Sequence, residues 1–137
     1  IQTANTLALY VRPGSSIEKR NEVINKWYRE KLREDIPELI EKWEKILKVK
    51  VNEFGIKQMK TRWGTCNTKA KRIWLNLELA KKPLHCLEYI VVHEMLHLIE
   101  RKHNERFKDL MDIHMPKWKQ YKNELNKFPV SHSEWEY

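Results

Sequence analysis

The chain has 137 residues, of which 41% are hydrophobic and 34% are charged. This length fits one domain with a hydrophobic core, and the composition excludes a disordered chain. No run approaches the roughly 20 apolar residues that a membrane-spanning helix needs, so we expect no membrane association. Lysine and arginine outnumber aspartate and glutamate by 27 to 19, which favours acidic partners without identifying one.

The N-terminus and the cysteines indicate the compartment. The sequence begins at Ile1 with neither an initiator methionine nor a secretion signal. We therefore expect a cytoplasmic protein, and we interpret residues 1–137 as a single domain from the C-terminal part of a longer protein. Cys66 and Cys86 are then expected to be free thiols, and a zinc site built on them is the less favoured alternative.

Apolar periodicity predicts helices in the first third of the chain. Apolar residues recur at three- and four-residue spacing over 17–32, which predicts an amphipathic helix capped by Ser15 or Ser16. Pro37 predicts a break, because proline removes a backbone hydrogen bond inside a helix. A second helical stripe follows over 39–47, and we expect both helices to be scaffold.

The pattern changes in the middle of the chain. Over 49–77, β-branched and aromatic residues alternate with polar ones, which predicts two or three short strands in a small sheet. Pro83 then opens a helix over 84–100, whose apolar residues cover nearly every direction, so this helix should be central and buried. Two further helices are predicted over 104–114 and 117–126.

The central helix contains the H-E-x-x-H arrangement of zinc peptidases. His93 and His97 are four residues apart, so their imidazoles lie on one helix face and can bind one ion. His103 can supply a third ligand where the chain turns back. Glu94 projects to the side, where its carboxylate can activate a zinc-bound water as general base. Three protein ligands leave a position open for water, as in a catalytic zinc site.

The alternative is that these histidines are ordinary core or surface residues. A polar side chain that is buried without a partner costs about 2 kcal/mol or more, and this apolar helix carries three such side chains in little more than one turn. Metal ligation would offset that cost, so we favour the ligand interpretation. His85, His114 and His132 lack comparable spacing and are expected not to bind metal.

Four segments together carry a resemblance to a known family. The segments 62–66 (RWGTC), 74–77 (WLNL), 92–97 (VHEMLH) and 103–107 (HNERF) resemble the YgjP-like metallopeptidases, relatives of the SprT-like and WLM proteases. The resemblance covers about residues 15–127. It implies an α+β, zincin-like domain in which a small sheet packs beside the metal-bearing helix, with flanking helices and with the three histidines named above as Zn²⁺ ligands.

Two features qualify this resemblance. The family usually has an N-terminal β-rich segment, of which residues 1–14, with Leu7–Val11 at their centre, would be a remnant. The histidine spacing equals that of the metzincins, which have glycine at the position of Glu100. The chain departs from that pattern, which favours the YgjP-like branch.

Three functions remain open from the sequence. The leading one is a zinc metallopeptidase acting on a peptide or protein. The resemblance also implies a nucleotide hydrolase that cleaves pyrophosphate from UTP, and a third function is a nucleic-acid-associated protein with a structural metal. Segment 56–82 bears on the choice, because it has eight basic residues against one acid, Glu78. Its alternative explanation is a solvated strand edge, where lysines discourage unwanted pairing.

Contacts with substrate are predicted at three places. The strand over 72–77 should be the substrate-facing edge, with Asn76 orienting substrate, although a strand-end turn contact is an equal alternative for Asn76. Arg62 can grip phosphate or carboxylate in a bidentate way. Trp63 and Trp74 could stack on bases but are favoured as core. With an anionic partner, a group of basic residues should form a positive surface that opens onto the zinc: Lys57, Lys60, Arg62, Lys69, Lys71 and Arg72.

Overall fold

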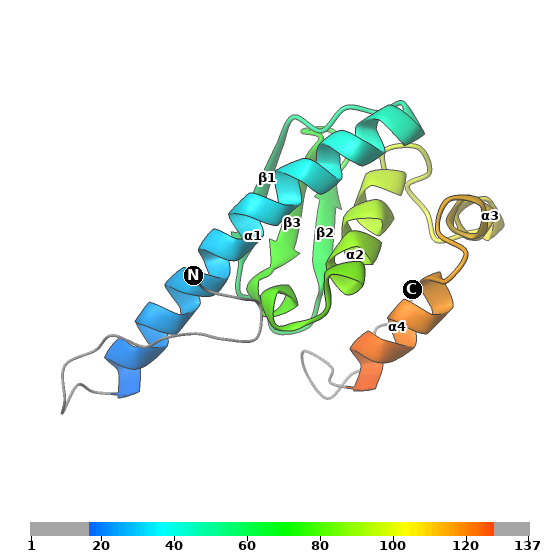
Figure 1. Cartoon of the computed structure of the whole chain (residues 1–137). Coiled ribbons are helices and arrows are strands. Elements are labelled where there is room, and N and C mark those ends of the chain that lie inside the picture. The colour runs from blue at the N-terminus through cyan, green and yellow to red at the C-terminus, as the bar shows by residue number, and fades with distance from the viewer. Residues whose placement is uncertain (1–16, 128–137) are drawn as a thin grey trace.

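The computed structural model describes residues 17–127 and has the α+β composition that the sequence predicts (Figure 1). The elements, in chain order, are α1 (Ile17–Leu47), β1 (Glu53–Lys57), β2 (Gly64–Asn67), β3 (Arg72–Asn76), the 3₁₀ helix η1 (Leu77–Lys81), α2 (Leu84–Leu96), α3 (Glu105–His114) and α4 (Trp118–Lys127). The predicted remnant at Leu7–Val11 and the predicted caps Ser15 and Ser16 lie outside the described residues. In the described part of the chain, no helix combines the length and the apolar character needed to cross a membrane.

The sheet has the strand order β1-β3-β2, with β1 parallel and β2 antiparallel to β3. The prediction that 72–77 forms the substrate-facing edge is therefore wrong, because β3 pairs on both sides. Ile73 and Leu75 of β3 are fully buried, as expected for a central strand. Among the described residues, the edge beside α2 is β2.

One face of the sheet carries the core. Helix α1 crosses this face, and α2 lies next to β2 (Figure 1). Every residue of α2 from Tyr89 to Leu96 is buried, which confirms the prediction of a central helix. Trp63 is also in the core. Because α2 is surrounded by apolar side chains, any polar group on it must find a partner inside the protein.

Helix α1 is continuous, so the predicted break near Pro37 is wrong. Its buried residues follow one another at three- or four-residue spacing through the proline: Leu32, Ile36, Ile40, Trp43 and Leu47. Pro37 itself is on the exposed side of the helix. The carbonyl that loses its partner there can be hydrated, so packing of the continuous apolar stripe outweighs the local cost of the proline.

Helix α2 ends at Leu96, four residues before the predicted end. The amides of His97 and Leu98 donate to carbonyls three residues earlier, so the final turn tightens. His97 is thus the C-cap residue, and the chain can turn back at once. The two later helices begin one residue after their predicted starts.

Candidate metal centre

The three predicted imidazoles meet where α2 ends. The Nε2 atom of His103 lies 3.1 Å from Nε2 of His93 and 2.9 Å from Nε2 of His97. His97 Nδ1 lies 3.2 Å from the carbonyl oxygen of Glu100, a contact in which the ring nitrogen donates. That hydrogen bond leaves the lone pair of the neutral ring on Nε2, directed at the other two imidazoles.

This arrangement fits a bound cation. A neutral imidazole has a single N–H, so three Nε2 atoms at these distances cannot all be satisfied by hydrogen bonds to one another. Burial lowers the pKa of His93 well below its usual range, lowers the pKa of His97, and lowers the pKa of His103 to about 4. The rings are therefore neutral at pH 7, which is the form that binds a metal ion.

Residues after the motif hold this geometry in place. The Glu100 side chain accepts a hydrogen bond from Asn104 Nδ2 at 3.1 Å, and Asn104 Oδ1 caps α3 by accepting from the amide of Phe107 at 3.1 Å. The Phe107 ring stacks on His97 with a centroid distance of 4.7 Å and meets His93 edge-on at 4.9 Å. The sequence interpretation gave Glu100 and Phe107 no role in the site. Asparagine is a preferred N-cap residue, so Asn104 at the start of the predicted helix is the sequence signal for this cap.

Glu94 is buried beside the imidazoles, with 3% of its surface exposed. Burial raises its pKa to about 8, and the positive charge of Arg62 opposes that rise. The carboxylate faces β2, because a Cβ atom built on Gly64 would lie 3.1 Å from Glu94 Oε2. Among the described residues, the ligand atoms that could share one ion at this place belong to the three histidines and not to Glu94.

The closeness of β2 to Glu94 predicts the effect of Gly64→Ala. The new Cβ would lie 2.9 Å from Ile90 Cγ2 and would press on the Glu94 side chain, so β2 or α2 must shift. We expect a loss of about 1–3 kcal/mol in unfolding free energy, together with reduced hydrolysis. Gly55→Ala is the matched control, because its Cβ meets Trp74 instead and should lower stability with little effect on turnover. A fully active Gly64→Ala variant would show that this contact does not position Glu94.

Two cavities open on the imidazoles. One, of about 170 Å³, lies on the β2 side and is lined by the three histidines, Glu94 and two arginines, Arg62 and Arg101. The other, of about 490 Å³, lies on the side of α3 and α4, against His93 and His103. The structure thus places Arg62 at the candidate site, and a substrate could lie across the metal centre with a cavity on each side.

Asn76 does not reach this site. It is fully buried, and its Nδ2 donates to the carbonyls of Met59 at 2.9 Å and Arg62 at 2.7 Å. Its Oδ1 accepts from the amide of Glu78 at 3.0 Å. The contacts match the strand-end alternative rather than substrate orientation. Asn76 acts structurally, because it fixes the loop from which Arg62 extends.

The basic residues of segment 56–82 are divided between two places. Of the six that were expected to open onto the zinc, Arg62 lines the smaller cavity with the histidines, and the other five do not. Lys57 instead lies 4.7 Å over the Trp74 ring, and Arg72 pairs with Glu53. Lys57 and Arg72 lie on strands and share the face opposite to Ile56 and Ile73, whereas Arg62 lies in the loop before β2.

A second group of ligand-type side chains links α2 to α4. His85 Nε2 lies 2.6 Å from Glu124 Oε2, and Cys86 Sγ lies 3.6 Å from the same oxygen. Burial and the neighbouring Glu124 raise the pKa of Cys86 to about 12, and burial and Glu94 raise that of Cys66 to about 12. Both are free thiols, and the hydrogen bond accounts for the position of His85.

The raised pKa of Glu94 predicts how the metal-free protein responds to pH. The carboxyl keeps its proton up to about pH 8 in the folded chain, whereas its ordinary pKa is 4.5, so wild-type stability should fall as pH rises through that window. Glu94→Gln has no such proton to lose. Urea unfolding of chelator-treated protein at pH 5 and pH 8 should show wild type losing on the order of 3 kcal/mol relative to the variant. Parallel pH profiles would mean that burial does not hold this carboxyl neutral.

A small sheet lies beside a buried helix whose histidines converge with His103, which is a zincin-like arrangement. The family that the sequence matches makes this protein a metallopeptidase, a hydrolase of the protease type. The chain belongs to the YgjP-like metallopeptidase family, whose domain description, "YgjP-like, metallopeptidase domain", matches residues 1–128. This confirms the family resemblance and the fold class expected from the sequence.

Two solved structures share the fold. The metallopeptidase zymogen of Pyrococcus abyssi abylysin has a TM-score of 0.62 and 20% identity, over 68% of this chain and 94% of that one. The metallopeptidase zymogen of Methanocaldococcus jannaschii jannalysin has a TM-score of 0.59 and 18% identity, over 67% and 94%. No curated protein matches the chain.

Proposed function

We propose that the chain is a zinc-dependent peptidase, in which His93, His97 and His103 bind Zn²⁺ and Glu94 is the general base. The observation that carries this proposal is the convergence of three Nε2 atoms, at 2.9 and 3.1 Å, next to a buried carboxylate. Three nitrogen ligands with room for one more are the donor set of a catalytic zinc site. The family to which the chain belongs supports a divalent metal at this place.

The chemistry follows from the position of Glu94. When bound, zinc would polarise the scissile carbonyl and lower the pKa of water. The Glu94 carboxylate accepts the proton of the water that attacks the carbonyl, and then donates it to the leaving amine. Arg62, whose charge favours the ionised form of Glu94, keeps part of this carboxyl deprotonated despite its burial. The positive charge of a bound ion acts in the same direction.

We propose that a peptide binds in extended form along β2. This strand is the sheet edge nearest to α2, and Thr65 and Cys66 line the smaller cavity. Main-chain hydrogen bonds to such an edge give affinity with little demand on sequence. This replaces β3 as the docking strand.

The deciding experiment compares substrate classes. Zinc-loaded protein is incubated in parallel with a mixed-sequence peptide library and with nucleoside triphosphates including UTP. Peptide cleavage that is lost in Glu94→Gln would support the peptidase. Release of pyrophosphate from UTP, with no peptide cleavage, would support the second function, nucleotide hydrolysis, which Arg62 and Arg101 at the smaller cavity favour.

Arg62→Ala should separate substrate binding from metal binding. Arg62 lines the smaller cavity, but imidazoles form the candidate ligand set, so zinc content should not change. Turnover of a peptide with an acidic residue near the cleaved bond should fall roughly tenfold, because a charge-assisted contact contributes about 1.5 kcal/mol. Arg62→Lys keeps the charge but not the bidentate geometry, so its turnover rate should lie between those of wild type and Arg62→Ala. Equal rates for all three proteins on acidic and neutral peptides would contradict a substrate contact.

A further inference from the structure

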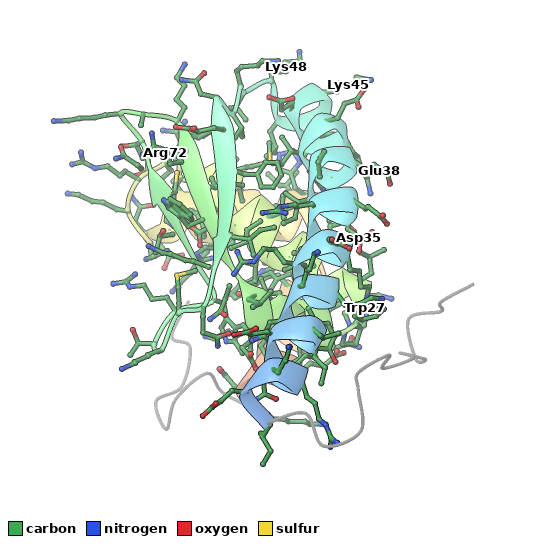
Figure 2. The ribbon with its side chains drawn as sticks, turned by 90° about the vertical axis from the view of Figure 1, so that its left-hand side faces the viewer. Trp27, Asp35, Glu38, Lys45, Lys48 and Arg72 are labelled. Atoms are coloured by element: carbon green, nitrogen blue, oxygen red, sulfur yellow. The ribbon has the colours of Figure 1, made fainter. Side chains whose placement is uncertain are left out.

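The sheet has a second face, turned away from α1. Figure 2 shows α1 on one side of the strands and Arg72 on the other, among side chains that project away from the helix. Strand register places Gly55, Trp74 and Thr65 in one row across the three strands. Lys57 is two residues beyond Gly55 on the same strand and therefore on the same face. Among the described residues, α1 lies on the side of the strands opposite to Arg72, and α2 contacts β2 and β3.

Trp74 lies in the middle of this second face. A Cβ atom built on Gly55 would be 2.2 Å from Cζ3 of the Trp74 ring, so the ring lies flat on the backbone of β1. Lys57 Nζ lies 4.7 Å from the ring centroid. The side chain is half-buried, in contrast to Trp63 in the core, so the preference for Trp74 as a core residue does not hold. An aromatic ring is thus presented at the surface with a cation beside it.

Lysines of β1 and of the loops on either side of β2 form no ion pairs within the described part of the chain. Lys57, Lys60, Lys69 and Lys71 are exposed, and among the described residues none of them forms an ion pair. Several lysines elsewhere form ion pairs, as with Lys42, whose Nζ lies 2.8 Å from Glu88 Oε2. The unpaired charges repel one another, and a polyanion would remove this repulsion.

The turn between β2 and β3 is fixed in shape. Asn67 Oδ1 accepts hydrogen bonds from the amides of Lys69 at 3.1 Å and Ala70 at 3.0 Å. Lys71 has a φ of 53°, in the left-handed region that completes such a turn. Lys69 is therefore held at the β2 to β3 corner, whereas Lys71 lines a cavity with Glu41 and Glu44 of α1.

We propose that this surface, the outer sheet face, binds single-stranded nucleic acid. It consists of Trp74 and Lys57 on the strands, Lys60 and Lys69 in the adjoining loops, and Arg72, whose side chain also pairs with Glu53. The cations would contact phosphates, and Trp74 would stack on a base once Lys57 moves from the ring to a phosphate. An acidic peptide would use the charges but not the ring, and paired bases in a duplex could not reach it. The site is separate from the metal centre and stands independently of the proposed peptidase activity.

The test measures the fluorescence anisotropy of a labelled single-stranded 12-nucleotide DNA and its RNA counterpart with the full chain. Both should bind. Their affinity should fall by roughly an order of magnitude or more between 50 and 200 mM salt, because each phosphate contact releases counterions from the nucleic acid. Trp74→Ala should weaken binding about 5- to 150-fold, since stacking contributes about 1–3 kcal/mol per base. Trp27→Ala, on α1, is the matched control and should bind as wild type.

A charge variant keeps the test independent of the tryptophan. The triple variant Lys57→Gln, Lys60→Gln and Lys69→Gln should reduce the salt dependence, whereas Lys26→Gln, Lys42→Gln and Lys45→Gln on α1 remove the same charge and should not. Absence of binding at 50 mM salt would overturn the proposal. A folded Trp74→Ala variant with wild-type affinity would also overturn it. Equal competition by duplex DNA or by polyglutamate would do the same, because the face would then bind any polyanion.

Discussion

Replacing Glu94 by glutamine should abolish hydrolysis while leaving the metal bound. The carboxylate is buried next to the imidazoles but is not one of the group of ligand atoms that could share the ion. Glutamine keeps the size of the side chain and cannot accept the proton of water. Removal of a general base costs about 10²- to 10⁴-fold, and the loss should fall on kcat.

The measurement pairs metal content, by mass spectrometry of the native protein, with kcat on the best peptide of the library. Glu38→Gln is the control, because this exposed glutamate lies on α1, on the outside of the molecule and away from both cavities (Figure 2). It should retain both metal and activity. A Glu94→Gln variant with a near-normal rate would end the general-base assignment, and one without metal would make Glu94 a ligand.

Replacing His97 by alanine should remove tight zinc binding and the stability that zinc supplies. His97 is the C-cap of α2, so a metal bound there ties the helix to the loop that carries His103. Loss of a direct ligand should weaken zinc affinity by roughly 100-fold or more, because even the loss of a residue that only orients a ligand costs about 10- to 100-fold. Added zinc should then no longer raise Tm, because stabilisation by a ligand depends on its affinity for the folded chain.

His85→Ala provides the contrast for this experiment. The side chain is the same, and it belongs to the other group of ligand-type residues, with Cys86 and Glu124. The variant should keep one zinc per chain and show the wild-type rise in Tm on zinc addition. If His97→Ala retains stoichiometric zinc and His85→Ala does not, the metal binds at the second group of residues and not at the three histidines.

The sequence predicts those parts of the site that depend on residues close together on one helix. Four-residue spacing on a helix brings His93 and His97 to one face, and an almost wholly apolar helix must be central. The contribution of Glu100 could not be predicted in this way. Its backbone carbonyl orients His97, and every residue has such a carbonyl. The position of His103 depended on where α2 ends, which the sequence pattern placed four residues too late.

The fold could be predicted as far as its elements, and less far in their pairing. The alternating pattern predicts strands over 49–77, but strand order depends on contacts between segments far apart in the chain. The strand predicted at the edge, β3, is therefore central. The same error gave Asn76 a substrate role, because alternation on an edge strand would have exposed it. The break predicted at Pro37 considers only the lost backbone hydrogen bond, whereas the buried apolar residues of α1 keep their helical spacing on both sides of the proline. In each case tertiary packing decided the outcome.

X-ray absorption of the zinc-loaded wild-type chain tests the central claim most directly. We expect the zinc to have only nitrogen and oxygen neighbours, namely three imidazoles at about 2.0 Å and one further light atom. The spectrum should lose this imidazole scattering in His97→Ala. A sulfur neighbour at about 2.3 Å would contradict the account, because it would place the ion on Cys66 or Cys86 instead of the three histidines.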